Sequence, residues 1–209
     1  MERRALLLRG SAFLGTLAVG DASRSRPYTL GRTREPVIGG PCEGCELVFE
    51  GMPPKLSSSA RIAPVGEPGA PMIIEGTVRT RQGKAAPEVI VYGYHTDNTG
   101  IYPPAATRHG RLRGWVMSDS DGRYHFETIR PVAYPGREIP QHVHMHMIEL
   151  GKATYFIDEL RFTDDPFITD RNRRTDERGG SGLVTPERRA GSWFARRDIT
   201  LGLNVPGYV

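Results

Sequence analysis

Apolar and polar residues alternate along the chain from Met72 onward in short runs that are typical of β-strands. Gly, Pro, Asn and Asp separate these runs, and the turn at residues 119–122 (Asp-Ser-Asp-Gly) predicts a hairpin between the two runs that flank it. No helical periodicity alternates with them, so the pattern favours an all-β fold, an antiparallel β-sandwich. The predicted strands are residues 72–79, 88–96, 114–118, 123–128, 141–150, 154–162 and 193–203.

The segments outside these strands have a different character. Residues 23–71 are rich in Arg, Ser, Gly and Pro and predict an extended arm that wraps the domain formed by residues 72–209. Residues 166–191 form a long polar insertion within that domain. The sequence therefore predicts one β-domain with an N-terminal arm.

Residues 1–22 resemble an export signal. Arg3 and Arg4 precede an apolar run that ends at Val19, and small residues follow it. The paired arginines are typical of a twin-arginine signal, which directs folded proteins out of the cytoplasm. We therefore expect a periplasmic or secreted protein, and a cytoplasmic one if the segment is not a signal. The run is too short, and too interrupted by Arg9, to cross a bilayer as a helix.

Composition and charge narrow the classes of partner. The 28 basic residues stand against 24 acidic ones, which gives a net charge of +4 and a mixed surface. The one dense basic run, residues 171–174, has acidic neighbours and no interleaved aromatic residues. It therefore predicts a solvated, salt-bridged loop, and we expect no nucleic-acid partner.

Two cysteines occur in the arm, Cys42 and Cys45. A single C-x-x-C motif is compatible with a redox pair, a local disulfide or half of a zinc site. No second cysteine pair and no thioredoxin-like βαβ pattern accompanies it. A structural pair is favoured, as a disulfide if the protein is exported.

Three histidines occupy alternate positions of one predicted strand: His142, His144 and His146. Alternate residues of a strand share a face, so the three imidazoles should point one way while Val143, Met145 and Met147 point into the core. This arrangement predicts a metal site mounted on a rigid strand. The alternative is an exposed histidine-rich strand without ligand function.

Three segments together resemble the intradiol ring-cleavage dioxygenases, the catechol and protocatechuate enzymes. Residues 98–102 (NTGIY) follow a strand, and residues 118–131 (SDSDGRYHFETIRP) lead into Tyr134-Pro135. Residues 140–144 (PQHVH) complete the set. They correspond to the family's D-x-D-G-x-Y-x-F-x-T-I-x-P-x-x-Y-P run and P-x-H-x-H strand, from residue 72 to the C-terminus.

The resemblance implies one non-haem Fe(III) bound by two tyrosines and two histidines, here Tyr102, Tyr134, His142 and His144. Hard, anionic phenolate oxygens suit a ferric ion, and imidazole suits iron as well. The implied reaction cleaves an ortho-diol ring with O2 to a muconate-type product. Tyr134 would be the ligand that the substrate displaces and would take up a substrate proton. Self-association into a homo-oligomer is left open.

Two positions depart from the family pattern. Ile139 stands where the family usually has an arginine that stabilises charge on the substrate, and Glu159 stands in place of a glutamine. Arg137 is the nearest basic residue in sequence that could replace the missing charge. His146 matches no family ligand, and we expect it to lie outside the direct ligand set.

Two other functions remain compatible with the sequence. One is a metal-binding, non-catalytic β-sandwich of transthyretin-like shape. The other is a metalloenzyme of different chemistry that uses His142, His144 and His146 as ligands. Among the remaining polar and aromatic residues, Tyr92, Tyr94 and His95 are expected to be sheet residues, and His109 and His125 are isolated.

Overall fold

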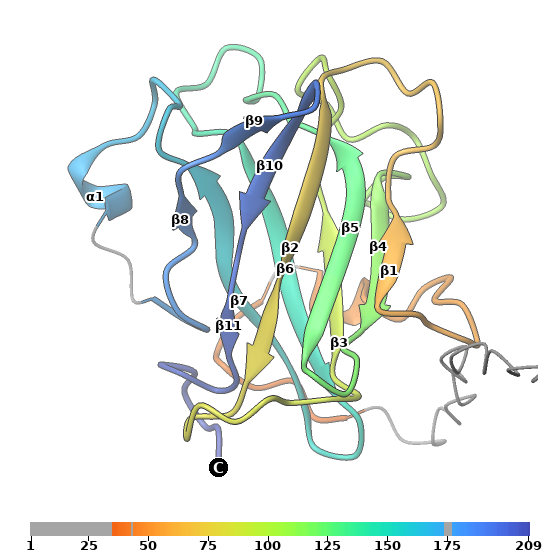
Figure 1. Ribbon diagram of the computed structural model, residues 1–209, viewed down its shortest axis with the longest axis vertical. Helices are drawn as coiled ribbons and strands as arrows, with labels where there is room; N and C mark the ends of the chain where they lie inside the picture. Colours follow the sequence, from red (N-terminus) through yellow and green to blue (C-terminus); the bar gives the residue numbers. More distant parts are fainter. Residues whose placement is uncertain (1–34, 43, 174–176) are drawn as a thin grey trace, which may run out of the picture.

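Two β-sheets pack face to face in the computed structural model, which describes residues 35–42, 44–173 and 177–209 (Figure 1). The export signal predicted for residues 1–22 lies outside the described residues. The described strands, in chain order, are β1 (Ser59–Arg61), β2 (Pro71–Arg79), β3 (Ile90–Tyr94), β4 (Arg113–Met117), β5 (Arg123–Ile129), β6 (His142–Glu149), β7 (Ala153–Phe162), β8 (Leu183–Val184), β9 (Glu187–Arg189), β10 (Ser192–Arg196) and β11 (Ile199–Thr200).

The first sheet has the order β1-β5-β2-β10-β9, with β11 beside β2, and the second has the order β4-β3-β6-β7-β8. The long central strands pair antiparallel, as β2 with β5 and as β3 and β7 with β6. Parallel pairs occur where the short strands β1, β8, β10 and β11 join. The predicted all-β sandwich is confirmed, and the parallel pairs are a feature that the alternation of residues did not predict.

The predicted hairpin at residues 119–122 is wrong. The turn itself forms, since the amide of Gly122 donates to the carbonyl of Asp119 at 2.9 Å. However, β4 pairs with β3 and β5 pairs with β2, so the turn carries the chain from one sheet to the other. The reason is burial: Val116 of β4 and Phe126 of β5 belong to the same core but enter it from opposite sheets.

The C-terminal third also differs from its prediction. The strand expected at residues 193–203 is divided into β10 and β11, because the side chain of Arg197 is buried between them and the carboxylate of Asp198 accepts the amide of Thr77 at 2.9 Å. The polar insertion contains a short helix, α1 (Asp170–Arg173), and the strands β8 and β9. The arm contributes β1 and a 3-10 turn, η1 (Cys45–Leu47).

Two apolar clusters organise the domain. The larger lies between the sheets and includes Val143, Met145 and Met147, as the alternation in β6 predicted. The smaller lies on the outer face of the β4-β3-β6 sheet, where Val48 and Leu56 of the arm cover Tyr92 and Trp115. Each fully buried aliphatic side chain stabilises the fold by roughly 1.5–3 kcal/mol, so these two residues anchor the arm.

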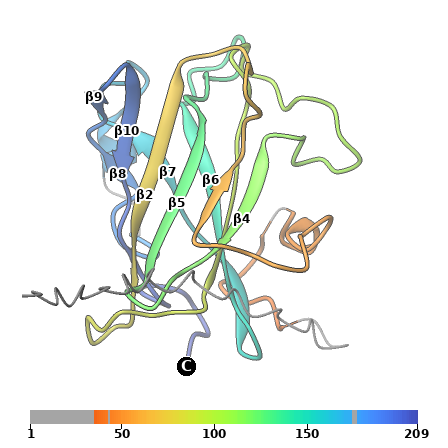
Figure 2. The same cartoon turned by 45° about the vertical axis from the view of Figure 1, so that its right-hand side comes forward.

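A hydrogen bond reinforces this anchor, because the Trp115 indole donates to the carbonyl of Val48 at 2.7 Å. Figure 2 shows the arm and η1 against this outer face. Of the helices in the described segments, none has the length and apolar character needed to span a bilayer.

Candidate metal centre

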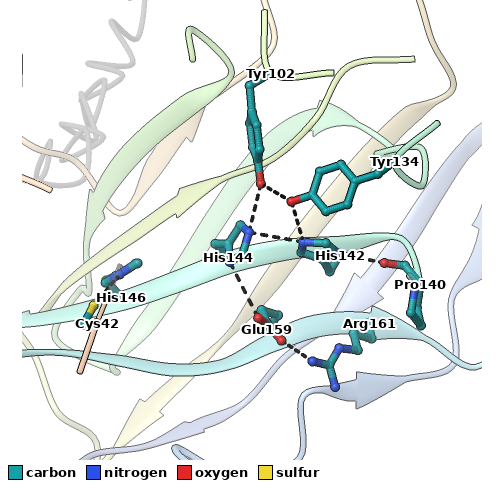
Figure 3. Close-up of polar contacts among 9 residues, drawn as sticks. All are labelled: Cys42, Tyr102, Tyr134, Pro140, His142, His144, His146, Glu159 and Arg161. Carbon is teal, nitrogen blue, oxygen red and sulfur yellow. Dashed lines mark hydrogen bonds and ion pairs between the residues drawn. The ribbon is translucent and has the colours of Figure 1, made fainter. Parts of the chain in front are cut away.

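Four polar side chains converge beside the arm, at one end of the outer face of β6. His142 and His144 come from β6 itself. Tyr102 comes from the loop after β3, and Tyr134 comes from the Pro/Gly-containing loop between β5 and β6. Figure 3 shows the two phenol oxygens and the two imidazole nitrogens turned toward one another. The structure thus brings together all four residues that the sequence predicts as metal ligands.

The four donor atoms form a closed ring. The hydroxyl oxygens of Tyr102 and Tyr134 are 2.6 Å apart, and Tyr134 Oη lies 3.2 Å from His142 Nε2. His142 Nε2 lies 3.2 Å from His144 Nε2, which lies 2.9 Å from Tyr102 Oη. Ligand atoms that share one metal at about 2.1 Å stand roughly 3 Å apart, so the spacing fits a single ion.

The orientation of His142 is set from its other side. Its Nδ1 donates to the carbonyl of Pro140 at 2.7 Å, which leaves an electron pair on Nε2 directed at the ring of donors. Two imidazole nitrogens and two phenol oxygens form a donor set that suits iron. The residues present therefore fit the ferric ion that the sequence implies.

His144 faces a carboxylate with its other nitrogen. Its Nδ1 lies 3.7 Å from Glu159, and Glu159 in turn accepts a hydrogen bond from Arg161. The register of β6 and β7 shifts between Val143 and Met145, so that two residues of β7, Asp158 and Glu159, stand opposite His144. A bulge of this kind changes the direction of nearby side chains, and here it accompanies the placement of the Glu159 carboxylate against His144.

A cavity of about 390 Å³ opens beside the four donors. Its lining includes Tyr102, Tyr134 and His144 on one side and residues of the arm on the other. Among the described residues, the lining consists of Pro41, Cys42, Gly44, Leu47, Tyr94, Tyr102, Arg108, His109, Tyr134, His144, Met145, His146, Phe156, Ile157 and Glu159. The arm is therefore a wall of the pocket as well as a cover for the sheet.

Burial favours the neutral forms of a phenol and three imidazoles of the pocket. Burial raises the pKa of Tyr102, and the hydrogen bond with Tyr134 raises it further. Burial lowers the pKa of His144 well below its usual range, and it lowers the pKa of His146 to about 3 and that of His109 to about 4. Neutral imidazoles keep the electron pair that a metal requires.

The other residues singled out in the sequence lie apart from the four donors. His146 Nε2 lies 3.6 Å from Cys42 Sγ, and Cys42 forms a disulfide with Cys45, as the sequence analysis favoured. Arg137 and Ile139 are exposed and are not among the residues that line the cavity. The role proposed for Arg137 therefore stays a prediction.

The sequence analysis assigned neither Arg108 nor His109 to the site. Arg108 is the one arginine or lysine among the described residues that line the cavity, and it pairs with Glu46 at 2.9 Å. His109 is buried, and its Nδ1 lies 2.8 Å from the Tyr92 hydroxyl. Both lie in the irregular loop between β3 and β4, where no periodic pattern indicates which side chains turn inward.

Comparison with known proteins shows the family to which the chain belongs. The family model described as Dioxygenase matches residues 51–178, which is more than half of the chain. Curated relatives include a catechol 1,2-dioxygenase of Acinetobacter lwoffii, 28% identical over 123 residues, and a chlorocatechol 1,2-dioxygenase of Rhodococcus opacus, 30% identical over 163 residues. The chain belongs to the intradiol ring-cleavage dioxygenase family.

The family match covers part of each relative. The aligned region is 50% of this chain and 40% of the Acinetobacter protein, and it is 68% of this chain and 61% of the Rhodococcus protein. The chain thus spans about half the length of these curated relatives.

Solved structures of intradiol dioxygenases share the fold. The dioxygenase domain of a carbohydrate-binding fusion protein from Streptomyces sp. SirexAA-E superposes with a TM-score of 0.57 at 22% identity, covering 74% of this chain and 96% of that domain. The catechol 1,2-dioxygenase of Acinetobacter sp. ADP1 superposes with a TM-score of 0.56 at 18% identity, covering 73% of this chain and 60% of that one. At these identities the likeness establishes the fold alone.

Proposed function

We propose that this protein is a non-haem Fe(III) intradiol dioxygenase that cleaves a catechol-type ortho-diol with O2 to a muconate-type dicarboxylate. The observation that carries the proposal is the closed ring of donor atoms from Tyr102, Tyr134, His142 and His144. When bound there, a ferric ion would take the two diol oxygens and make the ring susceptible to O2. Family membership supports the same chemistry.

The two histidines hold the metal from a rigid element. Both lie on the central strand β6, which pairs with β3 and β7 along its length. His142 is fixed by the carbonyl of Pro140, and His144 stacks on Tyr94 with ring centroids 4.5 Å apart. These contacts restrict both imidazoles before any metal arrives, which lowers the entropy lost on binding.

The two tyrosines differ in their surroundings, and this difference supports Tyr134 as the proton acceptor. Tyr102 packs against Tyr94 and His144. Tyr134 contacts the rings of Tyr102 and His142, but it lies on a loop whose next three residues, Pro135, Gly136 and Arg137, are exposed, and an exposed loop moves with less disruption. Tyr134 Oη is therefore the group that receives a proton from the incoming diol.

The lining of the cavity suits an aromatic substrate. Tyr94, His109 and Phe156 offer ring faces and edges to a planar guest, and Arg108 offers a positive charge at the wall. A cavity of about 390 Å³ is larger than a single aromatic ring requires, so a substituted ring fits it.

Iron loading followed by a catechol assay tests the proposal. Iron-loaded protein should show the burgundy absorption of ferric tyrosinate, consume O2 with catechol and release a ring-opened dicarboxylate. Absence of the colour in iron-containing protein would contradict the ligand set. Colour without O2 consumption across a panel of substituted catechols would leave the non-catalytic metal-binding sandwich as the better description.

A further inference from the structure

A second group of metal-ligating atoms lies on the same cavity, beyond the four donors. The sulfur atoms of Cys42 and Cys45 and a ring nitrogen of His146 all lie within 4.8 Å of one another. His146 follows His144 on the same face of β6, and Figure 3 shows it beside Cys42, away from the two tyrosines. This group is therefore distinct from the proposed iron site.

His109 lies close to this group, with its ring centroid 6.3 Å from that of His146, although its nitrogens are not among the atoms that lie within 4.8 Å of one another. Its ring stacks on Tyr94, with centroids 3.8 Å apart and planes inclined by 6°, and its side chain is 4% exposed. Its Nδ1 contacts the Tyr92 hydroxyl, whereas its Nε2 is buried with no hydrogen-bond partner among the described residues. A buried ring nitrogen without a partner is unfavourable and rare in folded proteins, so a ligand for this atom is expected.

The unpartnered nitrogen faces the cysteine loop. A side chain at Gly44, between the two cysteines, would collide with His109 Nε2. Gly44 also has a positive φ of 81°, a conformation that glycine adopts without strain. The loop thus passes directly over His109, and the imidazole of His146 approaches the same loop at Cys42.

We propose that Cys42, Cys45, His109 and His146 form a second metal site, for Zn²⁺ or a similar thiophilic divalent ion, when the disulfide is reduced. Two thiolates and two imidazoles are a donor set that zinc takes with tetrahedral geometry. The separation between His146 Nε2 and Cys42 Sγ is 3.6 Å. That is about the separation expected between a sulfur at 2.3 Å and a nitrogen at 2.05 Å on one tetrahedral zinc ion, roughly 3.6 Å.

The disulfide and the metal exclude one another. A dithiol reductant transfers two electrons and two protons to the Cys42–Cys45 bond and becomes a disulfide itself, which leaves two thiols in the loop. Zinc then binds as the two thiols release their protons to solvent. The cysteine loop in the cavity wall is consequently held by the Cys42–Cys45 disulfide in the oxidised protein and by the bound metal in the reduced protein.

Zinc titration of the full-length protein in both redox states tests this site. The protein is reduced with a dithiol, freed of reductant without air, and titrated with Zn²⁺ or Co²⁺ beside the untreated disulfide form. Zinc or cobalt that binds at the proposed iron site (Tyr102, Tyr134, His142 and His144) does so in both samples, and this amount is subtracted. The reduced protein should bind one further ion and, with Co²⁺, show the visible and thiolate charge-transfer bands of tetrahedral coordination.

Variants then identify the ligands. His146→Gln and His109→Gln should each weaken the additional zinc binding by more than about 100-fold, because even an outer partner of a ligand is worth about 10–100-fold. His125→Gln is the matched control, since His125 faces Glu75 on the other sheet. Cys42→Ser/Cys45→Ser protein should bind no additional ion in either redox state.

Two results would overturn the inference. Equal zinc stoichiometry in the reduced and oxidised proteins means that the cysteines form only a structural disulfide. If His109→Gln or His146→Gln protein binds zinc with wild-type affinity, that histidine is not a ligand, and the four-ligand site is excluded. Neither readout depends on iron or on turnover, so the site stands or fails independently of the dioxygenase function.

Discussion

The carboxylate of Glu159 lies 3.7 Å from Nδ1 of His144, on the side of the ring opposite the nitrogen that meets Tyr102. Arg161 holds the same carboxylate. A carboxylate behind a ligating histidine raises the basicity of the ligand and fixes its orientation. Glu159, which stands in place of the family's usual glutamine, thus directs its charge at a proposed metal ligand.

Glu159→Gln, which restores the residue usual in the family, should weaken iron binding by about 10-fold and shift the ferric band, because His144 becomes less basic. Competition with a chelator measures the affinity, and visible spectroscopy measures the band. Glu138→Gln, an exposed carboxylate on the loop before β6, is the control. Unchanged affinity in Glu159→Gln would show that the carboxylate does not act through His144.

His142→Ala and His144→Ala should each lose iron and colour together, since each removes one of the four donor atoms. His146→Ala should keep the iron band with at most a modest shift, because its Nε2 faces Cys42 instead of the tyrosines. Metal analysis and absorption spectra of the three variants check this. Loss of iron from His146→Ala would favour the three-histidine alternative.

Arg108 and Arg137 are the two candidates for the cation that the family usually supplies at the position of Ile139. Both side chains are exposed, but Arg108 lines the cavity, where it pairs with Glu46, whereas Arg137 lies outside the lining. Arg108→Ala should therefore lower kcat/KM for catechol by up to about 100-fold, the scale of one lost charge-stabilising contact, with the ferric band unchanged. A drop in Arg137→Ala with Arg108→Ala silent would instead support the residue indicated by the sequence.

Buried His95 should make the metal-free protein sensitive to acid. Its Nδ1 donates to the carbonyl of Thr96 and its Nε2 accepts from Thr128, each at 2.7 Å, and burial lowers its pKa to about 4. Between pH 6.5 and pH 4 the unfolded chain binds a proton that the folded one excludes, so stability falls as the pH falls through this window.

His95→Gln should therefore flatten the decline of the unfolding free energy between pH 6.5 and pH 4, by at most about 1.4 kcal/mol per pH unit. Urea unfolding at a series of pH values measures the slope in both proteins. An identical slope in the variant would mean that the other buried histidines account for the acid sensitivity.

Alternation along β6 was enough to predict which residues face the core and which face the site, because side-chain direction in a strand follows from sequence parity. The family resemblance added Tyr102 and Tyr134. Both lie on loops, where the direction of a side chain does not follow from its odd or even position in the sequence. The hairpin prediction failed because a turn sequence reports that the chain reverses and does not report which strand becomes the partner. Arg108 and His109 were missed for a related reason, since their inward direction depends on contacts with the arm.

The match to the Dioxygenase model begins at residue 51, whereas the lining of the cavity also includes Pro41, Cys42, Gly44 and Leu47. The pocket is thus assembled from a part that the family shares and a part that lies before it. Substitutions in the arm should change which molecules the cavity admits without disturbing the four residues proposed to hold iron. If the proposed function holds, new substrate preferences are therefore accessible to this chain through its N-terminal segment.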